Sequence, residues 1–330
     1  MKRIFTYLSL ISLLLLTACG NKQTTANNNA PKPIQIGIII PIEHPAMDEI
    51  TRGFEETLTA DLKQPIEFQV MRAQGDVNLQ RSMILQLQNK GIDLYAPIAT
   101  QPTEMTAAMI HDRPIVGLAA LLPESTRAKS QLALVDDEIT PTQIIQFIHA
   151  IYPTKTQLTL VYSNNDKMAP QVEEAIAAGK TVGIQVDKRM ITALPDLYSI
   201  AQSLSPQTQG ILVLKDVLVV SGIATLSQTA SQKHIPLISA DDGSVQNGSG
   251  FALGVKEYQI GVEGAKVAEQ ILQGTPAATI PTVKMTKLSV FINTKALTAQ
   301  GQDLAAIEKE AAKDNYAIVD VTNQPVGDLK

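Results

Sequence analysis

The sequence predicts an α/β protein made of two lobes, each with a mostly parallel sheet between layers of helices. Short runs of β-branched residues alternate with longer amphipathic segments, and this alternation starts again in the second half of the chain. The apolar runs are continuous, which is typical of parallel strands buried on both faces. The 330 residues, 45% of them hydrophobic, suffice for more than one packed core.

The first lobe begins with the apolar run at residues 34–40, which reads IQIGIII and ends at Pro41. Ile50, Phe54 and Leu58 follow at helical spacing, so we expect a helix with one buried face over residues 45–62. Right-handed crossovers turn a series of this kind into a doubly wound sheet. The remaining strands of this lobe are expected at 66–71, 92–98 and 114–118, with helices at 77–90 and 102–110.

The second lobe repeats the alternation after the apolar run at 132–135. The repeat lies in the order of the elements and not in residue identity, so we expect two lobes of one architecture. Strands are expected at 157–162, 183–190, 210–214 and 235–239, and helices at 141–151, 169–178, 196–204 and 217–231.

The last third of the chain contains more elements than a five-stranded second lobe needs. A strand at 251–255, a helix at 258–272 that ends beside Gly274, and a strand at 288–292 remain. We therefore expect the chain to return to the first lobe for this helix and then to cross again, which creates a multi-strand hinge. The expected first lobe comprises residues 34–135 and 256–285, the second comprises 136–255 and 286–301, and residues 302–330 form a peripheral tail.

Residues 1–18 have the features of an export signal. Lys2 and Arg3 precede an apolar stretch that is shorter than the ~20 residues a membrane-spanning helix needs, so a retained membrane helix is the weaker interpretation. Small residues and then Cys19 follow, an arrangement that resembles the lipobox of bacterial lipoproteins, whose cysteine is lipidated. An ordinary signal peptide with an incidental cysteine is the alternative. Residues 19–33 lack large apolar side chains, which predicts a flexible tether.

Several classes of function lack support in this sequence. The formal charge of −5, with no basic block beyond the first three residues, argues against nucleic-acid binding. The chain has one cysteine and four histidines without metal-ligand spacing, so we expect neither a disulfide framework nor a metal site. No G-x-S-x-G motif occurs, and the glycines around Gly243 and Gly250 lack a phosphate-binding arrangement. We therefore expect no cofactor.

The polar residues that follow the expected strands are the candidates for a site, because the carboxyl ends of parallel strands form one edge where loops converge. Thr100, Ser163 and Asn164 precede expected helices and could receive an anion such as a carboxylate. Asp216, with Asp241 or Glu43, could receive a cation such as an α-ammonium, so together these loops suggest an amino-acid ligand. Each residue alone could equally be a helix cap. The candidate ligand-binding residues are Glu43, His44, Thr100, Gln101, Ser163, Asn164, Asp216 and Asp241.

Residues 34–301 resemble the ABC transporter substrate-binding protein family that includes tryptophan- and tyrosine-type binding proteins. The resemblance implies a type I periplasmic binding protein fold, in which two Rossmann-like lobes are joined by three crossover strands and close on a ligand. The segments that carry it are Ile36-Gly37-Ile38, 43–48, Arg52-Gly53-Phe54, 73–76, 98–100, 234–236, 242–245, Gly254-Val255 with Tyr258 and Gly261, and 273–276.

Two loops depart from the family pattern. Where family members carry a Thr-Asp-Asn-type loop, this chain has Lys215-Asp216-Val217, so only the aspartate is kept. The loop at 163–166 differs as well. Tyr95, Tyr162 and Phe251 are the aromatic residues nearest to expected strand ends and could contact an aromatic ligand.

The expected function is that of a solute-binding lipoprotein of an ABC importer. It would hold a small ligand, an amino acid with an aromatic one preferred, in the cleft between the lobes and deliver it to a membrane permease. We expect a monomer without enzymatic activity, exported and lipid-anchored to the membrane, facing the periplasm or the cell exterior. A ligand-sensing lipoprotein of the same fold that signals to a membrane receptor is the alternative, and an exported α/β enzyme is a third.

Overall fold

The computed structural model describes residues 31–127 and 130–324 of the chain. The expected signal segment, Cys19 and most of the tether lie outside these residues, so those predictions remain predictions. The part from Pro33 onward forms one compact unit, and the account below concerns this unit alone. Among the described residues, no helix has both the length and the apolar character needed to span a bilayer.

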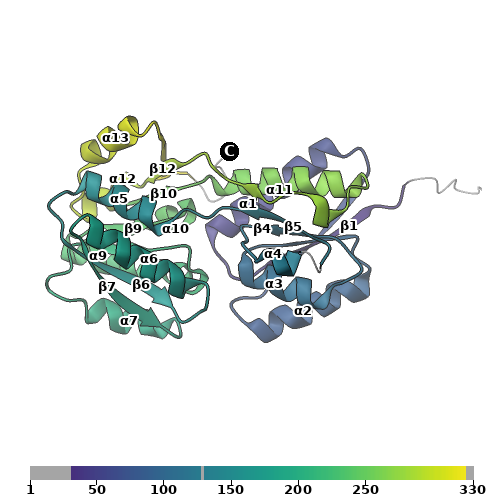
Figure 1. The fold of residues 1–330 in the computed structure, drawn as a ribbon, viewed down its shortest axis with the longest axis horizontal. Coiled ribbons are helices and arrows are strands. Elements are labelled where there is room, and N and C mark those ends of the chain that lie inside the picture. The colour runs from purple at the N-terminus through teal and green to yellow at the C-terminus, as the bar shows by residue number, and fades with distance from the viewer. Residues whose placement is uncertain (1–30, 128–129, 325–330) are drawn as a thin grey trace, which may run out of the picture. The chain divides into compact units, whose positions relative to one another are not determined.

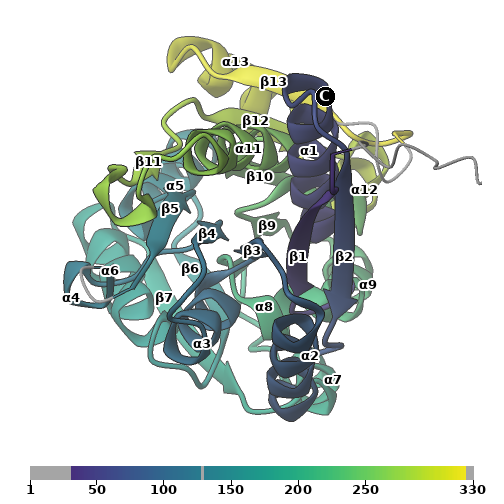
Figure 2. The same ribbon diagram turned by 90° about the vertical axis from the view of Figure 1, so that its right-hand side faces the viewer.

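The first lobe is built on a six-stranded parallel sheet (Figure 2). Within it, β1 pairs with β2, the edge strand, on one side and with β3 on the other. Ile36, Ile38, Ile39 and Ile40 of β1 are inaccessible to solvent, whereas Ile34 is partly buried. In spatial order the strands are β11 (Val283–Lys284), β5 (Leu132–Asp136), β4 (Ile115–Leu118), β3 (Leu94–Pro97), β1 (Ile34–Ile40) and β2 (Ile66–Arg72).

Helices on this sheet form the expected amphipathic faces. Ile50, Phe54 and Leu58 of α1 are fully buried, as their spacing predicts. Helix α11 packs on α1 at a glycine-mediated close approach, because a Cβ at Gly53 would lie 2.1 Å from the Tyr258 carbonyl oxygen. The helices of this lobe are α1 (Pro45–Asp61), α2 (Val77–Lys90), α3 (Thr100–Met109), α4 (Glu124–Arg127), α11 (Glu257–Leu272) and the 3-10 turn η1 (Ala277–Thr279).

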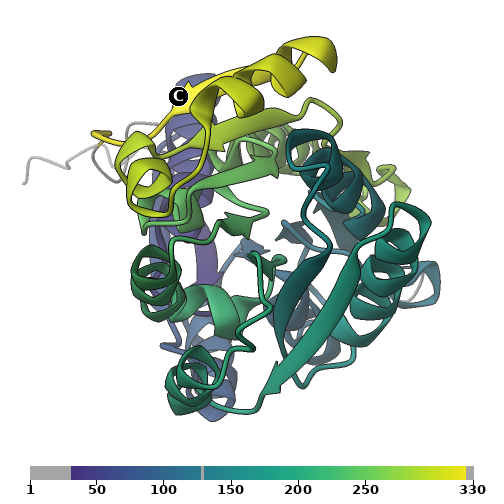
Figure 3. The ribbon, with the colours of Figure 1, turned by 90° about the vertical axis from the view of Figure 1, so that its left-hand side faces the viewer.

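The second lobe is built on a seven-stranded sheet (Figure 3). Its strands are parallel except that β10 and β12 pair antiparallel. In spatial order they are β13 (Ala317–Asp320), β12 (Ser289–Ile292), β10 (Phe251–Gly254), β9 (Leu237–Ser239), β8 (Ile211–Val213), β6 (Gln157–Ser163) and β7 (Gln185–Ile191). The helices are α5 (Pro141–Ile151), α6 (Met168–Thr181), α7 (Pro195–Gln202), α8 (Val217–Ser221), α9 (Ile223–Lys233), α10 (Asp242–Gln246), α12 (Thr294–Ala299) and α13 (Leu304–Lys313).

The chain passes three times between the lobes (Figure 1). The passages connect β5 to α5, β10 to α11 and β11 to β12, and each joins an element of one lobe to an element of the other. The predicted fold class, two Rossmann-like lobes with parallel sheets joined by a multi-strand hinge, is confirmed.

Several segments differ from the sequence-based expectation, among them α4, β11 and α12, which were not expected. The helix expected at 217–231 is divided into α8 and α9 at Gly222, and the short helix α10 was not expected. The segment expected as a peripheral tail contributes two elements to the second lobe. Helix α13 buries Ile307 and Ala311 in the same core as α5, and β13 extends the sheet beside β12. Ile307 and Ala311 are four positions apart and so lie on one face of the helix. That face is buried even though most other residues of the segment are polar or charged.

Candidate functional site

A cavity of about 660 Å³ lies between the lobes. First-lobe residues that follow β1 and β3 line one wall, and second-lobe residues that follow β6, β8 and β9 line the other. These are the carboxyl ends of parallel strands, the edge at which α/β sheets bind ligands. The volume falls within the ordinary range for small-molecule sites.

Most of the predicted site residues line this cavity. They are His44, Thr100, Gln101, Ser163, Asn164, Asp216 and Asp241. Glu43 is the exception, because its carboxylate is exposed and pairs with the Arg72 guanidinium at 3.2 Å. Its neighbour His44 turns inwards instead and caps α1.

Two of the lining aspartates are engaged by backbone donors. Asp216 caps α8 by accepting the N–H groups of Leu218 and Val219 at 3.1 and 3.3 Å, and its other oxygen accepts the Ser163 N–H at 2.5 Å. Asp241 caps α10 by accepting both the N–H and the hydroxyl of Ser244, at 2.6 and 2.7 Å. Both aspartates are therefore helix caps, the alternative to ligand binding that the sequence left open for them.

His44 is a buried cap with one free nitrogen. Its Nδ1 accepts the Ala46 N–H at 3.3 Å, so a neutral ring carries its proton on Nε2. Burial lowers the pKa of His44, although the charges of Asp241 and Asp48 act in the opposite direction. The ring is 3% exposed, and its Nε2 has no hydrogen-bond partner among the described residues.

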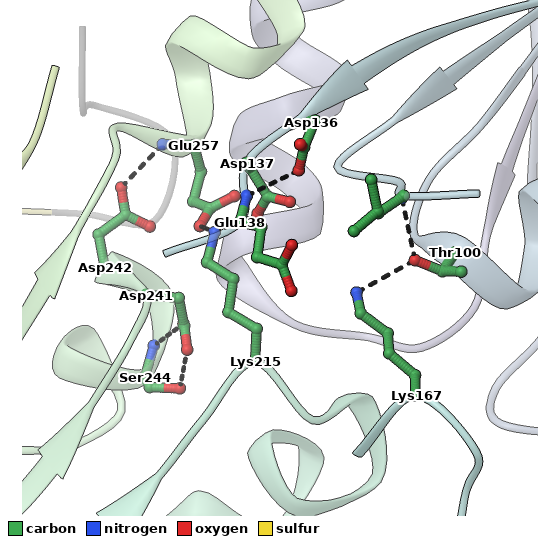
Figure 4. A network of polar contacts seen from close by, with 11 residues as sticks. Thr100, Asp136, Asp137, Glu138, Lys167, Lys215, Asp241, Asp242, Ser244 and Glu257 are labelled. Atoms are coloured by element: carbon green, nitrogen blue, oxygen red, sulfur yellow. Dashed lines mark hydrogen bonds and ion pairs between the residues drawn. The ribbon is translucent and has the colours of Figure 1, made fainter. Parts of the chain in front are cut away.

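One end of the cavity, which we call the acidic end, combines Asp137, Asp241 and Glu257 with Lys215 (Figure 4). The Lys215 ammonium donates to the Glu257 carboxylate at 2.8 Å and also to the Asp137 carboxylate. Asp137 directly follows β5, and Glu257 is the first residue of α11. Lys215 therefore connects the second lobe to two of the three passages between the lobes.

The protonation of the acidic end follows from burial. Burial alone would raise the pKa of Asp137, but the nearby charges of Lys215 and Lys167 outweigh it and lower that pKa. Burial raises the pKa of Glu257 well above its usual value despite Lys215. Behind them, burial and the charge of Asp241 raise the pKa of Asp242 to about 7. The charges of Lys215 and Lys167 thus favour the ionised form of Asp137, whereas burial favours the protonated forms of Glu257 and Asp242.

The other polar group, which we call the Lys167–Thr100 end, has a different chemistry. The Lys167 ammonium of the second lobe donates to the Thr100 hydroxyl of the first lobe at 3.1 Å, a direct contact between the lobes. The Thr100 oxygen also accepts the Leu121 N–H at 3.3 Å. Helix α3 begins here without a side-chain cap, after Ala99 in the left-handed region with φ of 75°. A cation, a hydroxyl and backbone N–H groups therefore lie together, and all of them can donate to an anion.

Between the polar groups the wall is aliphatic. Met47 and Ile50 of α1 face the cavity from the first lobe, and Met168 and Val220 face it from the second. None of the described lining residues is Phe, Tyr or Trp. Tyr95 and Phe251 belong to the cores of the two lobes, and Tyr162 packs beside the second core.

The candidate list omitted six charged residues that line the cavity: Glu104, Asp137, Asp166, Lys167, Lys215 and Glu257. Three of them had a usable signal. Asp137 and Glu257 stand where the chain leaves one lobe for the other, and Lys215 lies two residues after the buried strand β8. Charged residues at such positions are rarely accidental, because a strand end at a lobe junction is buried.

Comparisons with known proteins find matches that cover most of the chain. A sequence profile of the family described as "ABC transporter substrate binding protein" matches residues 35–314. An uncharacterized protein of Rickettsia prowazekii is 36% identical over 268 residues, which cover 81% of this chain and 86% of that protein. A protein named tyrosine-binding protein from Clostridioides difficile is 22% identical over 306 residues, which cover 88% and 89%.

Solved structures share the fold. The ABC domain in complex with L-Trp from Streptococcus pneumonia superimposes with a TM-score of 0.78 at 22% identity, covering 87% of this chain and all of that one (100%). A conserved domain protein from Vibrio cholerae superimposes with a TM-score of 0.77 at 22% identity, covering 84% and 98%.

Proposed function

The chain belongs to the ABC transporter substrate-binding protein family, and we propose that it is the solute-binding lipoprotein of an importer that captures an amino acid between its lobes. In this proposal the lipid at Cys19 anchors it outside the cytoplasm, and a membrane permease receives the ligand. The export signal and the lipobox-like sequence support the location.

The observation that carries the ligand class is the separation of charge in the cavity. Lys167 and Thr100 offer donors to a carboxylate, whereas Asp137, Asp241 and Glu257 offer acceptors to an ammonium group. Figure 4 shows that the two groups are separate: Lys215 points towards Asp137 and Glu257, and Lys167 points towards Thr100. A zwitterion with an apolar body matches a cavity with two such polar groups and an aliphatic wall.

Aromatic amino acids are the first ligands to consider. One neighbour was solved with L-Trp and one relative is named for tyrosine binding. Met47 and Met168 supply polarizable sulfur atoms to the wall, and sulfur atoms make favourable contacts with the edges of aromatic rings.

Closure explains how such a site could drive import. A ligand that contacts both lobes favours the closed arrangement by its difference in affinity for the closed and open states. Lys167 and Thr100 belong to opposite lobes and would grip one carboxylate together. A permease that recognises only the closed arrangement would then accept loaded protein and reject empty protein.

A thermal-shift screen of the refolded protein without its signal segment against the twenty amino acids tests the ligand class. A ligand present at 100 times its Kd should add about 2.7 kcal/mol to the free energy of unfolding, which gives a clear shift. The decarboxylated analogue of any hit should shift the midpoint much less, because it leaves Lys167 without a carboxylate. If no amino acid shifts the midpoint, the proposed ligand class is wrong.

A further inference from the structure

Helices α1 and α10 belong to different lobes and pack against each other where the lobes meet (Figure 1). Both begin beside the cavity, because His44 and Ala46 at the start of α1 line it, and so does Asp241, the residue before α10. Asp241 belongs to the acidic end of the cavity. The two helices therefore form a contact between the lobes at that end, whereas Lys167 and Thr100 meet at the other.

Gly243, the second residue of α10, makes this contact a close one. A Cβ at this position would lie 2.5 Å from the backbone nitrogen of Ala46 and 2.8 Å from the Cε1 atom of His44. Cβ contacts below 3.0 Å essentially never occur, so one of the two helices would have to move. The backbone does not require glycine here, since Gly243 has no positive φ. The missing side chain therefore serves the approach of the lobes and not a turn.

Neither helix can yield easily within its own lobe. The nearest atom, the Ala46 nitrogen, belongs to the backbone and donates to the Nδ1 of His44 in the cap of α1. Phe54 anchors α1 in the first core, and on the other side Asp241 caps α10 while Val245 is fully buried. The lobes themselves are joined by three passages of chain and not by a shared sheet. The separation of the lobes is therefore the coordinate that gives way first.

We propose that Gly243 sets how far the lobes close, because it lets α10 approach the start of α1 with no side chain between them. This inference rests on the proposed function and deepens it, since closure on a ligand is the step that it concerns. A methyl group at position 243 acts as a wedge between the lobes. Packed lobes move as rigid bodies, so a displacement at the acidic end is transmitted to the other end and separates Lys167 from Thr100.

Cross-linking without any ligand measures this closure. The reporter is a pair of cysteines, Gln101→Cys and Asp166→Cys, at exposed positions beside Thr100 and Lys167 in opposite lobes. A chain without residues 1–19 keeps the compact unit that begins at Pro33, and the two new cysteines are then its only thiols. A short bismaleimide joins them in the closed arrangement and leaves two separate adducts in the open one. Intact mass distinguishes the two products.

We expect Gly243→Ala to lower the ratio of cross-linked protein to double adduct at least about tenfold, because an extra methyl group overpacks a contact that closure makes. Its thermal midpoint should stay close to that of the parent, since opening relieves the overlap.

Gly179→Ala is the matched control. A Cβ at Gly179 of α6 would lie 2.5 Å from the Ile184 carbonyl oxygen, so the overlap is as severe, but both residues belong to the second lobe. This overlap cannot be relieved by opening. The control should therefore lose stability and keep the parent's ratio of products.

A second variant enlarges the other side of the contact. The Ala46 Cβ lies 3.1 Å from the Cβ position at Gly243, so Ala46→Val should lower the ratio in the same way. An unchanged ratio in folded Gly243→Ala, or an equal fall in Gly179→Ala, overturns the proposal. Failure of both Gly243→Ala and Ala46→Val to fold overturns it as well, because the contact then belongs to the folding core. No ligand is added, so the result is independent of whether any amino acid binds in the screen above.

Discussion

The acidic end and the Lys167–Thr100 end connect the same two lobes in opposite ways. At the latter, a partly exposed lysine makes one hydrogen bond to a hydroxyl across the cavity. At the acidic end, Lys215 pairs with two buried carboxylates that belong to the passages between the lobes. Opening the cavity at Lys167 costs one solvated contact, whereas separating Lys215 from its partners would expose unbalanced buried charge. We therefore expect the lobes to part at the Lys167–Thr100 end and to pivot near the acidic end.

The largest expected effect is on stability when the acidic end loses its cation. Lys215→Met should lower the free energy of unfolding by about 3 kcal/mol at neutral pH, because the buried Asp137 carboxylate loses its cationic partner. Urea denaturation measures this difference, and Lys167→Met is the matched control. A loss no larger than that of the control would mean that the two ends are energetically equivalent.

A second effect concerns pH. Burial and Asp241 raise the pKa of Asp242 from 3.8 to about 7, so the folded protein keeps a proton that the unfolded chain has released. Asp242 therefore makes the wild type lose stability as pH rises through this interval, and Asp242→Asn lacks this contribution. The stability of the variant relative to the wild type should increase by up to a few kcal/mol between about pH 4 and about pH 8.

Thermal midpoints of the two proteins across this pH range measure the effect. An asparagine oxygen can still accept the Glu257 N–H that Asp242 accepts at 3.3 Å, so the hydrogen bond is preserved. Asp112→Asn, at an exposed aspartate, should give no such trend. If the difference in thermal midpoint between Asp242→Asn and the wild type does not change with pH, Asp242 does not hold a proton in this pH range.

The smallest effect on stability is expected at the Lys167–Thr100 end. Lys167→Met should change the free energy of unfolding by less than about 0.5 kcal/mol, because partly exposed contacts of this kind contribute little. The same variant should lose affinity for a carboxylate ligand identified in the screen, by about tenfold, since a charge-assisted hydrogen bond is removed. A stability loss as large as that of Lys215→Met would remove the contrast between the two ends.

Much of the fold could be predicted because it depends on short-range pattern. The buried face of α1 follows from the spacing of Ile50, Phe54 and Leu58, and continuous apolar runs identify strands such as β1. The failures are equally local in origin. Gly222 divides one expected helix, and the charged residues of α13 obscured the apolar pair Ile307 and Ala311 that anchors it.

The candidate site was predicted less completely. Topology brought together the loops that follow the strands, so His44, Thr100 and Ser163 line one cavity. Sequence could not decide between a cap and a ligand contact for Asp216, because both functions suit an aspartate before a helix. Two of its backbone contacts are local, but the third, from the Ser163 N–H 53 positions away, became visible only in the folded structure.

The sequence by itself determined the order of the elements, the two lobes and the edge at which a site would form. These properties follow from periodicity and chain direction, which are local. Only the tertiary structure decided which charges meet: Lys215 and Asp137 are 78 positions apart, and Lys167 and Thr100 are 67 apart. Burial and pairing set the energy of an ionised group, and both depend on neighbours that the chain brings together only when it folds.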